Sequence, residues 1–282
     1  MSILEGTIEI QVEKIRVNGK GVIILTGPSS CGKGEVANTL RKALSIPKER
    51  HLSMGDILRM TISKARASKN FQETLSKTYH ISNDISIFDH DFNKIDLINK
   101  ALNHKDDITM FFDESSFISQ VDWLEYCVTM GLLIPDSWTV SIINAIFDDM
   151  AELKDNIFIL DGYPRTKVAA EELLNTFEEL DISVIDVIHL AITKNEMKKR
   201  AYGRKRIDDT EESLERRYQF YIENVQPSID YMKERLGPSR IKMIDAHQPV
   251  WIGGELDLEA SINNVTTSVL RAMGLPNYMI SL

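Results

Sequence analysis

Short apolar runs alternate with amphipathic stretches along most of the chain. Residues 21–26 and 157–160 are almost entirely apolar and rich in β-branched side chains, which is typical of strands buried on both faces of a sheet. Residues 184–191 and 241–244 have a similar character. Between these runs, apolar residues recur every three or four positions, the spacing of one helix face. The alternation predicts an α/β fold with a parallel sheet and helices on both faces.

The helical pattern also runs through most of residues 55–133. A polar, Asp-rich stretch around residues 83–93 interrupts it, and the apolar run at 108–112 is compatible with a short strand. Near the start of the chain, apolar and polar residues alternate over 8–13, which predicts a half-exposed strand. Three further stretches place their apolar residues on one helix face: 33–44, 138–153 and 258–269.

Composition narrows the class of protein. A chain of 282 residues is long enough for one large domain with insertions, and a net charge of -9 argues against a broad nucleic-acid surface. The first residues lack a secretory signal, and no segment has the roughly 20 apolar residues that span a bilayer. The two cysteines, Cys31 and Cys127, are far apart and in no metal-ligand spacing. We therefore expect a cytoplasmic, monomeric protein without nucleic-acid or membrane partners.

Residues 27–33, Gly-Pro-Ser-Ser-Cys-Gly-Lys, match the pattern G-x-x-x-x-G-K. A buried strand is expected to end at Thr26 and a helix to begin at Lys33, as a phosphate-binding loop requires. Glycines let the backbone curl so that its N–H groups face a phosphate, while the helix start and Lys33 add positive charge. The motif predicts a P-loop NTPase fold. Gly34 stands where many such loops have a metal-binding hydroxyl, so Mg²⁺ would be held through water, a more distant carboxylate and the nucleotide.

Cys31 lies inside this loop, beside a helix start and a lysine. Both features lower the pKa of a thiol, which would make Cys31 reactive. The alternative interpretation is that Cys31 only fills space in the loop, and it is the simpler one.

Four more blocks follow the loop in order: His-Leu-Ser-Met-Gly-Asp-Ile-Leu-Arg at 51–59, Gly-Leu-Leu-Ile-Pro-Asp at 131–136, Leu-Asp-Gly-Tyr-Pro-Arg-Thr at 160–166, and an arginine-rich block at 200–217. With the loop, they resemble the adenylate kinase family of nucleoside monophosphate kinases, and the resemblance covers residues 21 to about 231. It implies ATP and a nucleoside monophosphate as substrates and Mg²⁺ as cofactor.

The resemblance also implies which residues form the site. The ATP-binding residues would be Gly27, Ser29, Ser30, Cys31, Gly32, Lys33, Gly34, Arg200 and Arg204. The residues that bind the monophosphate would be Ser53, Met54, Gly55, Arg59, Leu133, Ile134, Gly162, Arg165 and Ala169. The catalytic groups would be Lys33, Arg165, Arg206 and Arg217, and Asp161 would hold Mg²⁺ through water.

Elementary chemistry agrees with these assignments. The transition state of phosphoryl transfer is loose and spreads negative charge over the moving group, so the protein mainly supplies positioning and cations. Guanidinium groups grip phosphate oxygens at two points. Arg165 follows a buried strand and a Gly-Tyr-Pro turn, where a surface arginine has little reason to lie. Asp161 ends that strand, at the sheet edge where ligands are expected.

The sequence leaves open which nucleoside monophosphate accepts the phosphoryl group. AMP is the default, with the reaction ATP + AMP = 2 ADP. In the family a threonine is usual at the position of Met54 and an adenine-reading glutamine at that of Ala169, so both polar readers are replaced by apolar groups. A site without such partners discriminates weakly between bases, which favours relaxed specificity or a shift toward CMP or UMP. Two other functions stay open: a kinase with a non-nucleotide acceptor, and a catalytically silent nucleotide-binding regulator.

We divide the chain into an N-terminal extension at 1–20 and an adenylate-kinase-like domain at 21–282. Within the domain, 54–136 is expected to be an enlarged subdomain for the monophosphate, and 200–209 a short lid. The insertion at 64–130 offers a possible surface for a protein partner. Five of its residues invite a metal site, although their spacing fits no ligand pattern and favours solvated surface: His80, Asp89, His90, Asp91 and His104.

Overall fold

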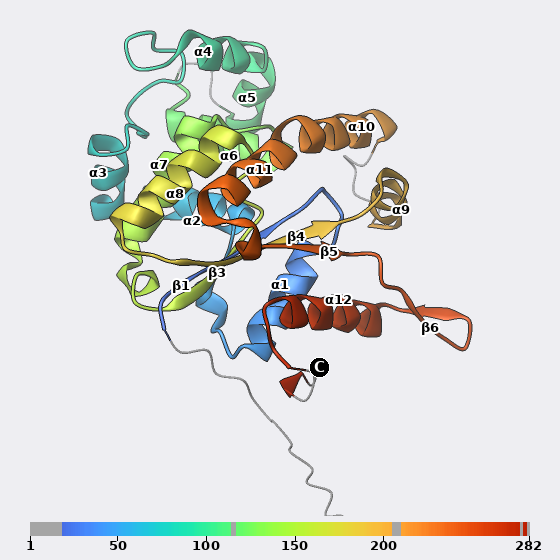
Figure 1. The fold of residues 1–282 in the computed structure, drawn as a ribbon. Helices are drawn as coiled ribbons and strands as arrows, with labels where there is room; N and C mark the ends of the chain where they lie inside the picture. Colours follow the sequence, from blue (N-terminus) through green and yellow to red (C-terminus); the bar gives the residue numbers. More distant parts are fainter. Residues whose placement is uncertain (1–18, 114–116, 205–209, 277–278, 281–282) are drawn as a thin grey trace, which may run out of the picture.

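The computed structural model describes residues 19–113, 117–204, 210–276 and 279–280. Its main sheet has five parallel strands in the order β2-β3-β1-β4-β5, and a two-stranded antiparallel hairpin, β6–β7, lies beside it (Figure 1). The strands are β1 (Gly21–Thr26), β2 (His51–Ser53), β3 (Ile157–Asp161), β4 (Val184–Ala191), β5 (Ile241–Asp245), β6 (Val250–Ile252) and β7 (Glu255–Asp257).

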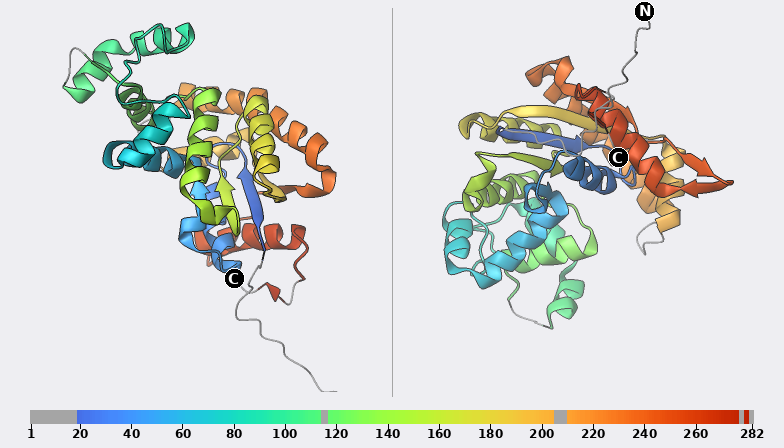
Figure 2. Two further views of the ribbon diagram at one scale, coloured as in Figure 1. Left: turned by 90° about the vertical axis from the view of Figure 1, so that its left-hand side faces the viewer. Right: turned by 90° about the horizontal axis from the view of Figure 1, so that it is seen from below.

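Helices cover both faces of the sheet, as the alternating pattern predicts. Helices α1 and α12 lie on one face, and α7, α8 and α11 lie on the other (Figures 1 and 2). Each face of the sheet has its own core, because successive side chains of a strand point to opposite faces. In β1, Ile23 and Leu25 belong to the first core, under α1 and α12, and Val22 and Ile24 belong to the second core, on the other face. These helices are α1 (Lys33–Ala43), α7 (Asp136–Asp149), α8 (Lys167–Glu179), α11 (Gln226–Leu236) and α12 (Leu258–Ala272).

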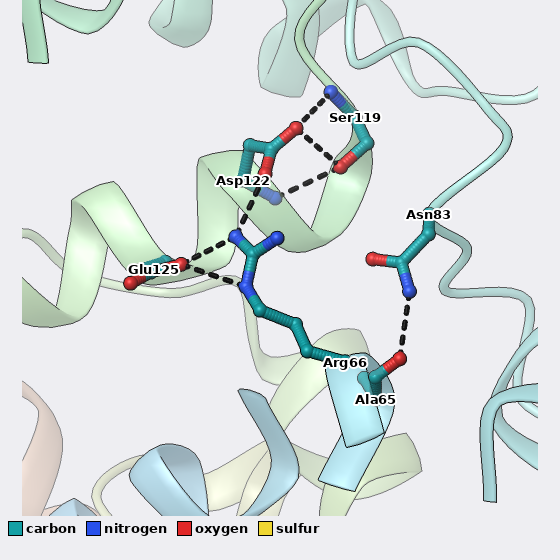
Figure 3. Close-up of polar contacts among 6 residues, drawn as sticks. All are labelled: Ala65, Arg66, Asn83, Ser119, Asp122 and Glu125. Atoms are coloured by element: carbon teal, nitrogen blue, oxygen red, sulfur yellow. Dashed lines mark hydrogen bonds and ion pairs between the residues drawn. The ribbon is translucent and has the colours of Figure 1, made fainter. Parts of the chain in front are cut away.

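The segment between β2 and α7 folds into helices that extend the second core away from the sheet (Figure 2). They are α2 (Met54–Ala67), α3 (Lys69–Lys77), α4 (Ile95–Leu102), α5 (Lys105–Phe112) and α6 (Gln120–Met130). Arg66 on α2 ties this segment together (Figure 3): its guanidinium lies 2.8 Å from the Asp122 carboxylate, and its Nε donates to Glu125 at 3.1 Å, both on α6. Asn83 donates to the Ala65 carbonyl at 2.8 Å from the intervening loop.

The arginine-rich part of the chain forms α9 (Lys194–Arg204) and α10 (Glu211–Phe220), followed by a π-helical turn at Tyr221–Val225 that leads into α11. Single 3₁₀ turns occur at Lys48–Arg50, Ala151–Leu153 and Pro238–Arg240. Among the described residues, no helix is both long and apolar enough to cross a membrane.

One predicted element is wrong. Residues 108–112 form the end of helix α5 rather than a strand. Only Ile108 of this helix is buried, and Asp106 and Asp107 occupy its first turn, where carboxylates favour a helix start. A short apolar run cannot be assigned to strand or helix by periodicity alone. The predicted helix at 138–153 begins two residues earlier and ends at Asp149. The predicted strand over 8–13 lies outside the described residues.

Candidate functional site

The phosphate loop lies between β1 and α1, and its glycines are required by its shape. Gly27 has φ +147, and a Cβ there would lie 2.5 Å from the Leu190 carbonyl oxygen of β4 and 2.9 Å from the Cys31 sulfur. Gly32 has φ +91 and precedes α1 without a side-chain cap. The first N–H groups of α1 therefore remain available to an anion, as the motif predicts.

Two polar side chains of the loop fit a phosphate ligand. The Lys33 ammonium donates to the carbonyl oxygens of Gly27 at 3.0 Å and Pro28 at 2.8 Å, so it lies folded over its own loop. The Ser30 hydroxyl is buried without a hydrogen-bond partner, and Ser30 has φ 58. An unpaired buried hydroxyl in this loop suits a ligand rich in acceptor oxygens.

The expectation of a lowered pKa at Cys31 is wrong. Cys31 is buried, and burial raises the pKa of its thiol by more than the charge and hydrogen bonds of Lys33 lower it. The free energy needed to remove the thiolate from water exceeds the stabilisation that one nearby ammonium group provides. Cys31 is thus a neutral thiol that fills space under the loop, in agreement with the simpler interpretation.

Arg200 comes to the phosphate loop from α9. Its guanidinium donates to the Cys31 carbonyl at 3.3 Å and to the Ala246 carbonyl at 2.8 Å, and its Nε donates to Glu196 at 2.9 Å. Figure 1 shows α9 at the same end of the sheet as the start of α1. Two other arginines of the predicted site lie outside the described residues. They are the side chain of Arg204, which is predicted to bind ATP, and the whole of Arg206, which is predicted to be catalytic.

Asp161 is placed at the same sheet edge, next to the loop. It ends β3, and the strand register sets it opposite Leu25 of β1 and Ser53 of β2. Its carboxylate is buried, and Oδ1 has no hydrogen-bond partner. The other oxygen, Oδ2, is 3.8 Å from Nε2 of His51, a nitrogen that is also unpaired. His51 belongs to the sequence block at 51–59, but nothing in the spacing distinguished it as a neighbour of Asp161.

Arg165 lies beyond the turn that follows β3. The Gly162 N–H donates to the Leu25 carbonyl at 2.9 Å, and the Gly162 carbonyl accepts from Arg165 Nε at 2.9 Å, so the turn folds the arginine back toward β1. Solvent reaches the Arg165 side chain, yet burial among protein atoms lowers its pKa, while the charge of Asp161 acts in the opposite direction.

The predicted acceptor residues divide into two groups. Ser53 caps α2 by accepting from the Asp56 N–H at 3.1 Å, and Asp56 pairs with Arg59 at 2.7 Å, so Arg59 is exposed but held. Gly55 lies against Arg59, since a Cβ there would be 3.3 Å from its guanidinium. Met54 and Ala169, by contrast, are buried in the apolar core.

Leu133 and Ile134 lie in the segment between α6 and α7, with Leu133 exposed and Ile134 half-buried. The start of α7 is tied to the start of α8, because the Thr166 hydroxyl donates to the Asp136 carboxylate at 2.8 Å. This hydrogen bond joins the sequence blocks at 131–136 and 160–166.

His189 is a buried neighbour of the phosphate loop that no sequence pattern predicts. It is fully buried on β4, opposite Thr26 of β1, and its Nε2 lies 2.9 Å from the Tyr221 hydroxyl. Burial, with a smaller contribution from the positive charge of Lys33, lowers the pKa of His189 to about 4. The only signal in the sequence was a histidine within an apolar strand, which carries no function by itself.

A separate hollow of about 310 Å³ lies in the helical segment between β2 and α7, lined by Arg66, Asn83, Phe112, Phe117, Ser119 and Asp122. Phe112 and Phe117 flank residues 114–116, which lie outside the described part of the chain, so nothing is assigned to it. Within the described ranges, no three His, Cys, Asp or Glu side chains gather as a metal site.

The chain is similar to known adenylate kinases. A family model described as Adenylate kinase matches residues 119–236, which include the Asp161 and Arg165 turn, Arg200 and Arg217. The chain is 28% identical over 254 residues to an adenylate kinase of Mycobacterium sp. (strain MCS), covering 89% of this chain and 98% of the relative. It is 26% identical over 215 residues to an adenylate kinase of Corynebacterium urealyticum (strain ATCC 43042 / DSM 7109), covering 76% and 87%.

Among solved structures, a gluconokinase from Sinorhizobium meliloti 1021 aligns with 91% of this chain and 93% of its own at 12% identity and a TM-score of 0.45, a likeness from which nothing is argued. The family match, the relatives and the sequence blocks agree. The chain is similar to members of the adenylate kinase family along most of its length and is an adenylate kinase-like phosphotransferase.

Proposed function

We propose that this protein transfers the γ-phosphoryl group of ATP to a nucleoside monophosphate, with AMP as the default acceptor. The observation that supports this most is the convergence at one sheet edge. The phosphate loop follows β1, Asp161 ends the neighbouring strand β3, and Arg165 lies just beyond that strand. The donor and acceptor blocks are far apart in sequence, so this meeting depends on the strand order 3-1 within the sheet.

Each group has a role in this proposal. Lys33, Arg200 and the loop N–H groups would bind ATP, while Arg59 and Arg165 would bind the phosphate of the acceptor. An oxygen of the acceptor phosphate attacks the γ-phosphorus, the bond to the bridging oxygen of ADP breaks, and ADP leaves. Because the transition state spreads charge over the moving group, Arg165 and Arg217 would stabilise it electrostatically. Residues 200–209 would act as a short lid that excludes water.

The residues at the site fit Mg²⁺ held through water. Asp161 Oδ1 is buried and unpaired, and a water bound to the ion can satisfy it. Gly34 offers no hydroxyl, so Asp161 would be the main protein group for the ion. When bound, Mg²⁺ would neutralise charge on the nucleotide phosphates.

The base of the acceptor is the least constrained feature. Met54 and Ala169 are buried apolar groups, and neither can hydrogen-bond a base edge. Weak discrimination follows, and a pyrimidine monophosphate such as CMP or UMP is the alternative acceptor that this observation favours. Residues 54–136 would form the enlarged acceptor subdomain and 1–20 an N-terminal extension.

The test is a set of initial rates of ADP formation by the purified chain with ATP and AMP, CMP, UMP, GMP or dTMP. We expect activity with AMP and less than about tenfold preference among bases. Replacing Arg165 with alanine should lower kcat/KM by roughly 100- to 1,000-fold, because it removes a charge aimed at the moving phosphoryl group.

The matched control is Arg235→Ala, which removes a surface guanidinium that pairs with Glu178 near the end of α8 and should leave the rate unchanged. A strong AMP preference would contradict relaxed specificity. ATP binding without turnover of any of the five monophosphates would favour the silent regulator instead.

A further inference from the structure

The contact between His189 and Tyr221 joins the strand beside the phosphate loop to the helix that carries Arg217. The two side chains are 2.9 Å apart at Nε2 and the hydroxyl, and their rings stack with centroids 5.8 Å apart at an interplanar angle of 9°. Gln226 donates to the same hydroxyl at 3.5 Å. Both rings are buried, so the contact is shielded from water.

The His189 end of the contact is fixed relative to the phosphate loop. His189 pairs in register with Thr26, the residue immediately before Gly27. The next residue of β4, Leu190, has its carbonyl oxygen so close to Gly27 that no side chain fits between them. Any displacement of His189 would therefore move the backbone on which the phosphate loop rests.

The Tyr221 end is fixed relative to Arg217. The two residues are one turn apart, so their side chains lie on the same face of the helix. The Tyr221 N–H also donates to the Arg217 carbonyl. Anchoring the Tyr221 side chain on β4 thus constrains the rotation of α10 about its axis, together with the packing of Leu214 on α9.

The helix changes its winding at this residue. The π-helical turn begins at Tyr221 and ends at Val225, where α11 takes over and packs against α8. A π turn holds one residue more than an α-helical turn and is frequent at functional sites. It lets α10 take an orientation of its own while α11 stays in the core. The bond to His189 is a buried side-chain hydrogen bond that holds this junction to β4.

We propose that Tyr221, held by His189, is a positioning residue that directs Arg217 toward the transferring phosphoryl group. This inference rests on the proposed function, because it gives Arg217 a role in the transfer. Tyr221 itself touches no substrate in this account; it acts through the direction of the helix.

The first test is Tyr221→Phe, which keeps the stacked ring and removes only the hydroxyl. We expect kcat for the preferred monophosphate to fall about tenfold, because a small misplacement of a group that stabilises the transition state is costly. The KM for ATP should stay within about twofold, since Lys33 and the loop are not altered. His189→Phe removes the same bond from the other side and should give a similar loss. The control is Tyr231→Phe, whose hydroxyl accepts from Arg235 on the surface and should not matter.

The second test separates positioning from a purely structural role. In a chain that already carries Arg217→Ala, Tyr221→Phe should cause no further loss of kcat, because the residue it positions is gone. The inference would be overturned if Tyr221→Phe lowered kcat by the same factor with and without Arg217. It would also be overturned if Tyr221→Phe, as the single change in an active chain, left kcat unchanged. A wild-type chain that forms no ADP at all overturns the proposed function, and this inference with it.

Discussion

At the residue scale, burial decides the protonation of the side chains beneath the phosphate loop. Burial raises the pKa of Cys31 and of Tyr221, and it lowers the pKa of His189 to about 4. All three are therefore uncharged at neutral pH. Lys33 is the cation of the loop, so in the proposed function an incoming phosphate would meet positive charge without a competing carboxylate or thiolate from the loop itself.

His189 should make stability depend on pH. Its pKa in the folded protein, about 4, is below the ordinary value of 6.5, so the unfolded chain takes up a proton that the folded chain refuses. The contribution of the neutral His189 to the free energy of unfolding is complete above about pH 6.5 and is lost as the pH falls toward 4. Between pH 7 and pH 5 the free energy of unfolding should drop by about 2 kcal/mol through this residue.

Urea unfolding of the wild type and of His189→Phe at both pH values measures this contribution. The variant lacks the titrating ring, so its loss of stability on going to pH 5 should be smaller by about 2 kcal/mol. Equal losses in the two proteins would mean that His189 is not held neutral.

At the element scale, the phosphate loop predicts opposite effects for two of its glycines. Gly27→Ala places a Cβ 2.5 Å from the Leu190 carbonyl at a φ of +147, whereas a Cβ at Gly34 meets nothing within 4 Å. We expect Gly27→Ala to cost about 1–3 kcal/mol of stability and to weaken ATP binding at least about tenfold. Gly34→Ala should gain up to about 1 kcal/mol, because alanine favours the first turn of α1.

Thermal unfolding and ATP titration of the two variants give the comparison. The two changes add the same methyl group seven residues apart, so a difference between them reports local geometry alone. Comparable stability and ATP affinity for both would argue against the close approach of β4 to the loop.

Single elements were predictable where one pattern dominated. Four strands and the helix at 33–44 follow from apolar runs and a clear stripe, and the structure contains them, although only Ile244 of β5 is buried. Strand β2 was missed because it has three residues, of which only Leu52 is buried. The hairpin β6–β7 turns at Gly253-Gly254, but its apolar residues Trp251, Ile252 and Leu256 are exposed, so no core-facing pattern marked it.

At the scale of the whole molecule, the site depends on strand order, which no local pattern encodes. The phosphate loop could be recognised from its own residues, because glycine spacing and Lys33 carry the chemistry. The place of Asp161 beside Leu25, and of His189 opposite Thr26, follows from pairing between strands more than 130 residues apart in sequence. The resemblance to a family supplied the roles of Arg165 and Arg217, whereas His51, His189 and Tyr221 required the fold.

The proposed reaction moves a phosphoryl group from one nucleotide to another, so its products can be counted in a single mixture. The chain is incubated with ATP, AMP and Mg²⁺, and the nucleotides and free phosphate are quantified by chromatography over time. We predict two ADP formed for each ATP consumed, equal consumption of AMP, and little free phosphate with or without AMP. Release of one phosphate per ATP with AMP unchanged, or no turnover with any monophosphate, would contradict the account.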